Sequence, residues 1–105
     1  MQDVTIEAIN DYDLFTKKQK KVLTTLVSVA VENVAYISVP SISKAINLAP
    51  NSTYIVLRSL ENSGYISRKR DQFQKNNSYN INKEKLNLLV KIYKKKRTGL
   101  NLIKK

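Results

Sequence analysis

The chain has 105 residues, of which 42% are hydrophobic, and this length accommodates one domain with a small core. It contains no cysteine and no histidine, which excludes disulfide frameworks, zinc sites built on these residues, thiol nucleophiles and the commonest general base. Nineteen basic residues against eight acidic ones give a formal net charge of +11, which attracts polyanions such as nucleic acid and anionic membranes.

The first fifteen residues form an acidic lead-in. Residues 1–16 carry a net charge of −4, whereas the chain from Lys17 onward carries +15. Apolar residues within the lead-in fit a short helix or strand lying against the body, namely Val4, Ile6, Ile9, Leu14 and Phe15. The segment does not resemble a signal peptide and no apolar run reaches the length of a bilayer span, so we expect a cytoplasmic protein with no membrane span.

Catalysis finds little support in the sequence. The only close pair of carboxylates, Asp11 and Asp13, is more typical of solvated charges before a helix than of metal ligands. We therefore expect no enzymatic activity, no metal site and no cofactor.

A first long helix is predicted from residue 16 onward. Thr16 is followed three residues later by Gln19, which is the capping-box pattern. Apolar residues then recur at helical spacing, at Val22, Leu23, Leu26, Val27, Ala30 and Val34. The pattern indicates a mostly buried helix, with a strand as the alternative near its end.

Two further helices separated by a tight turn follow. Tyr36 to Val39 should be extended, because Pro40 disfavours a helical conformation in the residue before it. A short helix then directs three residues inward, Ile42, Ala45 and Ile46. Pro50 begins the next helix after only three residues, Asn47 to Ala49. This spacing is typical of a helix-turn-helix.

The helix from Pro50 to Ser63 has two distinct faces. Its inner stripe consists of Thr53, Val56, Leu57 and Leu60. Its outer stripe consists of Asn51, Ser52, Tyr54, Ile55 and Arg58, with Asn62 as a further candidate. The stripe has almost no net charge, because Glu61 balances Arg58. Asn can pair with adenine and Arg with guanine, and Tyr or Ile can meet a thymine methyl, so this stripe suits base edges in DNA. A solvated surface is the competing interpretation.

A hairpin is predicted after Gly64, which ends the helix. Residues 65–70 and 78–81 form its strands, with Ile66 facing inward, Arg68 outward, and Tyr79 and Ile81 on one side. Basic and polar residues gather toward its tip, namely Arg68, Lys69, Arg70, Gln72, Lys75, Asn76 and Asn77. They suit contacts to a phosphate backbone or the minor groove, although an inert loop would look similar.

This order of elements resembles the winged helix-turn-helix superfamily. The segment NSTYIVLRSLENSGYISRKR (51–70) is similar to the recognition helix and the start of the wing in bacterial MarR-like and PadR-like regulators. The matching features are the polar start at 51–53, the pair Leu57 and Leu60, and the Gly-Tyr-Ile junction at 64–66. The resemblance implies duplex DNA binding, with Asn51, Ser52, Tyr54 and Arg58 in the major groove and residues 68–77 as the wing. The wing lacks the Asp-Arg-Arg sequence of many MarR-type regulators.

A basic helix is predicted at the C-terminal end. Asn82 is a suitable N-cap, and helical spacing places four residues on one apolar face, Leu86, Leu89, Val90 and Tyr93. Leu88 and Ile92 widen this face. We expect it to cover the domain and to support a homodimer that sets two recognition helices about 34 Å apart on DNA.

Together these patterns predict a single-domain, mainly α protein with a small β-wing (α+β), a winged helix-turn-helix. It would comprise the lead-in at 1–15, the DNA-binding domain at 16–82 and a basic helix and tail at 83–105. The predicted function is sequence-specific binding of double-stranded DNA, as a small transcriptional regulator. Two alternatives stay open: a plasmid or phage factor acting at an origin, centromere or conjugative transfer site, and a module that binds proteins or anionic membranes. The sequence does not specify a small-molecule effector.

Overall fold

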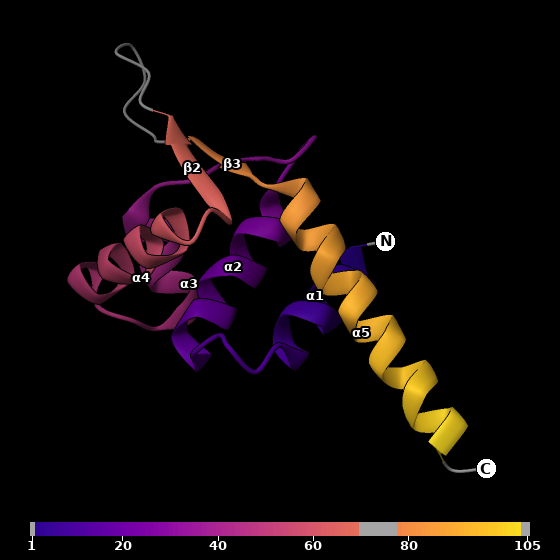
Figure 1. Cartoon of the computed structure of the whole chain (residues 1–105). Coiled ribbons are helices and arrows are strands. Elements are labelled where there is room, and N and C mark those ends of the chain that lie inside the picture. Colours follow the sequence, from indigo (N-terminus) through magenta and orange to yellow (C-terminus); the bar gives the residue numbers. More distant parts are fainter. Residues whose placement is uncertain (1, 70–77, 104–105) are drawn as a thin grey trace.

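The computed structural model describes residues 2–69 and 78–103 (Figure 1). Within these ranges the elements are α1 (Gln2–Asp11), α2 (Lys17–Val29), β1 (Val34–Tyr36), α3 (Val39–Ile46), α4 (Pro50–Asn62), β2 (Ile66–Lys69), β3 (Ser78–Ile81) and α5 (Lys83–Ile103). The three strands form an antiparallel sheet in the order β1-β3-β2. The predicted class is confirmed: helices dominate, and the sheet is small.

The core gathers apolar residues from both ends of the chain. The hydrophobic side chains with 1% exposure or less are Ile9, Val22, Leu23, Leu26, Ala35, Ile42, Leu60 and Tyr79. α2 supplies the centre of this cluster, and α1, α3, α4 and the sheet surround it. The N-terminal lead-in is therefore a part of the domain core.

The lead-in folds as the helix α1, one of its two predicted forms. Ile9 and Phe15 are buried, whereas Leu14 remains 79% exposed. Phe15 stands edge-on to Tyr12 and to Tyr65, with ring centroids 4.9 Å apart in both pairs. Burial, helped by the neighbouring Tyr12, raises the pKa of Tyr65 to about 12, so its hydroxyl stays neutral. These rings join the end of α1 to the start of the hairpin.

The capping box at the start of α2 is confirmed. The Thr16 hydroxyl accepts from the Gln19 N–H at 3.1 Å, and the Gln19 side chain accepts from the Thr16 N–H at 2.9 Å. The helix nevertheless ends at Val29, so the prediction that Val34 belongs to it is wrong. Glu32 and Asn33 have positive φ, and Val34 begins β1, where it pairs with Asn80. The β-branched valines favour this ladder over a longer helix, and the alternative of a strand is confirmed.

α3 differs from its prediction at both ends. Val39 is helical although it precedes a proline, because the Ser38 side chain caps the helix and Pro40 lies in the first turn, where no N–H is needed. Ala45 is exposed, contrary to its predicted inward position. Ser43 is buried instead, and its hydroxyl donates to the Thr53 hydroxyl at 2.8 Å.

The turn between α3 and α4 falls where the sequence predicts it. Asn47 caps α3 in the left-handed conformation at φ 54°. The Leu48 N–H then donates to the Ser43 carbonyl at 2.9 Å, and Leu48 packs half-buried against the core. α4 begins at Pro50 without a side-chain cap from Ala49.

The end of α4 and the start of α5 are joined by hydrogen bonds. Gly64, at φ 82°, follows α4, and the Tyr65 N–H returns to the Leu60 carbonyl in the manner of a Schellman motif. Asn82 donates to the Gly64 carbonyl at 2.9 Å and accepts from the Lys85 N–H at 3.3 Å, which confirms it as the N-cap. The Lys85 ammonium donates to the Ser63 carbonyl.

The hairpin confirms two predicted positions and corrects a third. Tyr79 and Ile81 are buried on one face of β3. Arg68 was predicted to face outward, but it lies two residues from the buried Ile66 and therefore shares its face of the strand. Residues 70–77, the predicted tip, lie outside the described residues.

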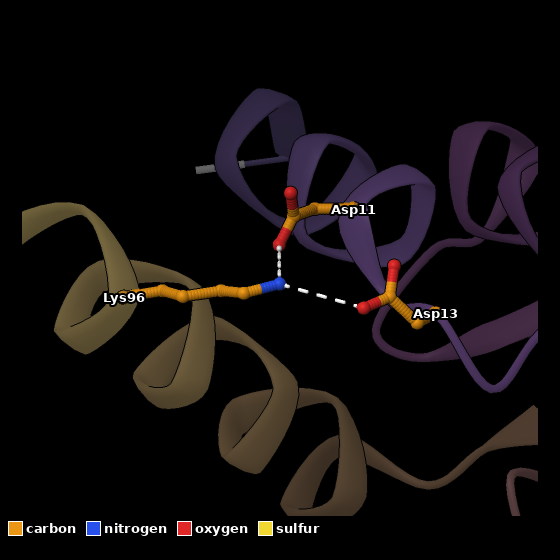
Figure 2. A network of polar contacts seen from close by, with 3 residues as sticks. All are labelled: Asp11, Asp13 and Lys96. Carbon is orange, nitrogen blue, oxygen red and sulfur yellow. Dashed lines mark ion pairs between the residues drawn. The ribbon is translucent and has the colours of Figure 1, made fainter. Parts of the chain in front are cut away.

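α5 packs along α1 and extends beyond the rest of the molecule (Figure 1). Leu86 and Leu89 are buried in the core, and Val90 and Tyr93 pack against it. The Tyr93 hydroxyl lies 3.1 Å from a Glu7 carboxylate oxygen. Figure 2 shows the Lys96 ammonium between two carboxylates of the lead-in, 3.6 Å from Asp11 and 3.7 Å from Asp13. These ion pairs are exposed, so each contributes at most about 1 kcal/mol.

The buried contact between α3 and α4 yields a first prediction. Thr53→Val keeps the shape of the side chain but leaves the buried Ser43 hydroxyl without its acceptor, which should lower the free energy of unfolding by about 1–3 kcal/mol in urea titrations. The double variant Ser43→Ala/Thr53→Val should recover part of this loss. Thr24→Val, which removes only an exposed hydrogen bond, is the control. If the double variant loses as much free energy of unfolding as Thr53→Val, or more, the buried hydrogen bond does not have the role assigned to it.

Gly64→Ala should also destabilise the domain. An alanine at this position would have to keep φ 82°, which is strained for a residue with a side chain, and its Cβ would lie 3.2 Å from Lys85 Nζ. We therefore expect the free energy of unfolding to fall by about 1–2 kcal/mol in thermal or urea unfolding. Asn47→Gly is the matched control, since glycine accepts the left-handed conformation of that cap without strain. A neutral Gly64→Ala variant would contradict this assignment.

Candidate nucleic-acid interface

The outer face of α4 presents the predicted base-reading residues together. Asn51, Tyr54, Ile55 and Arg58 are exposed and Ser52 is half-buried. Ile55, at 69% exposure, is unusually open for a large apolar side chain. Arg58 is the one charged residue among these five. The face thus combines hydrogen-bonding and apolar side chains. Base edges in the major groove likewise combine hydrogen-bond donors and acceptors with the thymine methyl group.

The inner face of α4 is held by packing and by polar contacts. The four predicted inner residues, Thr53, Val56, Leu57 and Leu60, are all buried. Besides the bond from Ser43 on α3, the Gln19 side chain on α2 donates to the Ser59 hydroxyl at 3.1 Å. The helix is thereby fixed to both α2 and α3, and its outer side chains project from a rigid support.

The start of α4 adds a backbone feature. Because Ala49 forms no side-chain cap, the N–H groups of the first turn are left to water or to an anion. A phosphate is stabilised at such a position by these donors and by the helix dipole.

Arg68 contacts α4, a contact that the sequence did not predict. Its Nη1 donates to the Tyr54 hydroxyl at 2.8 Å, and its Cζ lies 5.3 Å from the centre of the Tyr54 ring. This hydrogen bond raises the pKa of the Arg68 guanidinium above its ordinary value. The two residues are separated by 14 positions, and only the strand register of β2 brings them together.

The other predicted wing residues are described only in part. Lys69 ends β2 and pairs with Ser78. The remaining five, Arg70, Gln72, Lys75, Asn76 and Asn77, lie outside the described residues. Of the two predicted wing residues within the described ranges, Arg68 contacts the outer face of α4.

Positive charge surrounds the helices that support α4. Exposed lysines on α2 and α3 include Lys17, Lys18, Lys21 and Lys44.

The described part of the chain offers little for other kinds of site. Within residues 2–69 and 78–103, no group of three acidic side chains is arranged to hold a metal ion. None of the helices in these ranges is both long and apolar enough to cross a membrane. A hollow of about 380 Å³ lies between α1, α2 and α5, lined by Thr5, Val27, Ala30, Asn33 and Leu86 among others.

Comparison with known proteins places the fold. No family model matches the chain, and the comparison with curated proteins finds no relative. Among solved structures, MepR, a transcription regulator of the Staphylococcus aureus multidrug efflux pump MepA, is 18% identical with a TM-score of 0.65, and the match covers 97% of this chain and 75% of MepR.

Two further structures give the same result. A MepR mutant from S. aureus bound to an oligodeoxyribonucleotide is 19% identical with a TM-score of 0.63, covering 91% of this chain and 70% of that one. A MarR family protein from Bacillus stearothermophilus is 19% identical with a TM-score of 0.59, covering 94% and 65%. By its structure, the chain therefore has the winged-helix fold of the MarR-type transcription regulators.

Proposed function

We propose that this protein binds specific sequences of double-stranded DNA with α4 in the major groove and acts as a small transcriptional regulator. The observation that carries the proposal is the reading face: an exposed, nearly uncharged stripe on a helix that is rigidly held from behind, in a chain with a net charge of +11. The MepR mutant bound to an oligodeoxyribonucleotide supports it, because the two chains share the fold.

The arrangement separates two tasks of DNA binding. Contacts to phosphates position a protein on the duplex, and contacts to base edges select the sequence. Exposed lysines on α2 and α3 suit the first task, and the side chains of Asn51 and Arg58 suit the second. Ile55 offers apolar contact to a thymine methyl.

Regulation of transcription is proposed ahead of a plasmid or phage role, since MepR is itself a transcription regulator. A binding role is likewise proposed ahead of catalysis. We propose no cofactor, and we place the protein in the cytoplasm, where its DNA would be found.

The decisive experiment is selection from a random pool of duplex DNA at several salt concentrations, followed by sequencing of the retained fraction. Enrichment of a motif that survives near-physiological salt is the expected result. If retention of DNA falls steeply with salt and no motif is enriched, the protein binds DNA only through non-specific electrostatic attraction. In that case partner proteins or anionic membranes would become the leading candidates.

Arg58→Ala should weaken binding to the selected motif by about 1–3 kcal/mol and relax preference at one base position. Lys44→Ala removes the same charge from an exposed site on α3, so it controls for loss of general attraction. Both affinities can be measured by fluorescence anisotropy on the motif and on single-base variants. If Arg58→Ala keeps full discrimination among sites, Arg58 is not a reader.

We also propose a homodimer formed through α5. Leu86 and Leu89, two of the four residues predicted for this interface, are buried in the core of their own chain and leave little surface for a partner. Val90 and Tyr93 pack against that core. The exposed apolar residues of the helix are Leu88 and Ile92, at 55% and 50% exposure, and Leu14 stands nearby on the rim of a hollow that Ile92 also lines.

In Figure 1 the C-terminal half of α5 and the recognition helix lie at opposite ends of the molecule. Pairing through α5 would therefore leave both copies of α4 open to DNA. A twofold dimer binds half-sites about 34 Å apart, so the selected motif would be palindromic.

Leu88→Asp/Ile92→Asp should convert the dimer to a monomer in sedimentation equilibrium, because each partner would bury charge. The same variant should lose most affinity for the full motif while keeping the circular dichroism of the folded chain. Lys91→Ala, on the same helix and exposed, is the control. A wild-type monomer at high micromolar concentration would contradict the dimer.

A further inference from the structure

We infer that Arg68 is a positioning residue, which acts on DNA recognition through Tyr54 and does not form an independent phosphate contact. The inference rests on the proposed function, since it assigns to one residue of the same site a part in sequence selection.

The contact fixes both the ring and the hydroxyl of Tyr54. Nη1 of Arg68 bonds the hydroxyl at 2.8 Å while the guanidinium lies near the ring, with Cζ 5.3 Å from its centre. Tyr54 is 39% exposed on the outer face of α4, with Arg58 one turn further along the helix. Because the contact engages both the ring and the hydroxyl, it restricts the rotamers of Tyr54 before DNA arrives.

Arg68 can do this because its backbone is held in a strand. It lies within β2 and pairs with Tyr79 of β3, a residue 1% exposed in the core. The strand therefore fixes the root of the long side chain, and the guanidinium reaches back to α4. Arg68 is half-buried, in contrast to the exposed lysines on α2 and α3.

The surroundings also reduce its availability to a phosphate. A small hollow beside the pair is lined by Tyr54, Leu57, Arg58, Glu61, Arg68 and Tyr79. The carboxylate of Glu61 attracts the Arg68 guanidinium, and the Tyr54 hydroxyl occupies one of its donors. Part of the guanidinium charge and hydrogen-bonding capacity is thus engaged within the protein.

The test is a double-mutant cycle on DNA binding. Tyr54→Phe removes only the hydroxyl, and Arg68→Met keeps an unbranched side chain without its donors. Each protein, and the double variant, would be titrated with the selected motif and with its single-base variants at several salt concentrations. Ser67→Ala, exposed on the adjacent position of β2, is the control.

If Arg68 positions Tyr54, both single variants alter preference at the same base position and weaken binding to the motif about fivefold or more, and the double variant is no worse than the stronger single one. Arg68→Lys, which keeps the charge, should lose the preference too, because lysine does not reproduce a planar, stacked guanidinium. The salt dependence of Arg68→Lys should equal that of the wild type.

The opposite result is equally distinct. Independent effects of Tyr54→Phe and Arg68→Met, normal preference in Arg68→Lys, and a salt slope lowered by about 0.9 in Arg68→Met would identify a phosphate contact and overturn the inference. The proposed function would then stand, since the wild type would still select a motif. Failure of the wild type to select any motif would overturn both. If Arg68→Met does not fold, as judged by circular dichroism, the cycle of Tyr54→Phe with Arg68→Lys decides.

Discussion

The direction of the outer face of α4 depends on the burial of the opposite side of the helix. Thr53, Val56, Leu57 and Leu60 fill the space against α2, α3 and the sheet, so the helix cannot rotate without exposing them to water. Each large residue of this kind contributes about 1.5–3 kcal/mol when fully buried. The outer residues inherit their direction from this packing, because a helix that is fixed on one face has its other face fixed as well.

Two hydrogen bonds fix the position of α4 relative to α2 and α3 more closely than apolar packing alone. The bond from Ser43 reaches the N-terminal half of α4, and the bond from Gln19 reaches Ser59 near its C-terminal half. Gln19 also completes the capping box of α2, so one side chain both begins that helix and ties it to α4. Such contacts are directional, whereas apolar burial tolerates small shifts. They set the position of α4 along its own axis against α2 and α3.

Much of the fold could be predicted because its determinants are local. The capping box at Thr16, the turn at Asn47 and the cap at Gly64 each depend on a few neighbouring residues. The errors arose where distant segments decide. Val34 lies in β1 and pairs with β3 instead of extending α2, and Ser43, in place of Ala45, is buried and bonds Thr53. The strand register places Arg68 on the same face as Ile66. The five outer residues of α4 followed from spacing alone, but the partner of Tyr54 did not.

Charge placement separates the two ends of the molecule. Three of the acidic residues of the lead-in are engaged by α5: Glu7 meets Tyr93, and Asp11 and Asp13 meet Lys96. Carboxylates held there offset the positive charge of α5 locally. Among the described residues, α1 packs on α5 and α2 and does not contact α4. Because exposed charges are screened within about 8 Å at physiological ionic strength, the carboxylates of α1 do little to weaken the field around α4. The acidic lead-in therefore acts mainly on α5, and the positive charge of the lysines on α2 and α3 keeps most of its reach around α4.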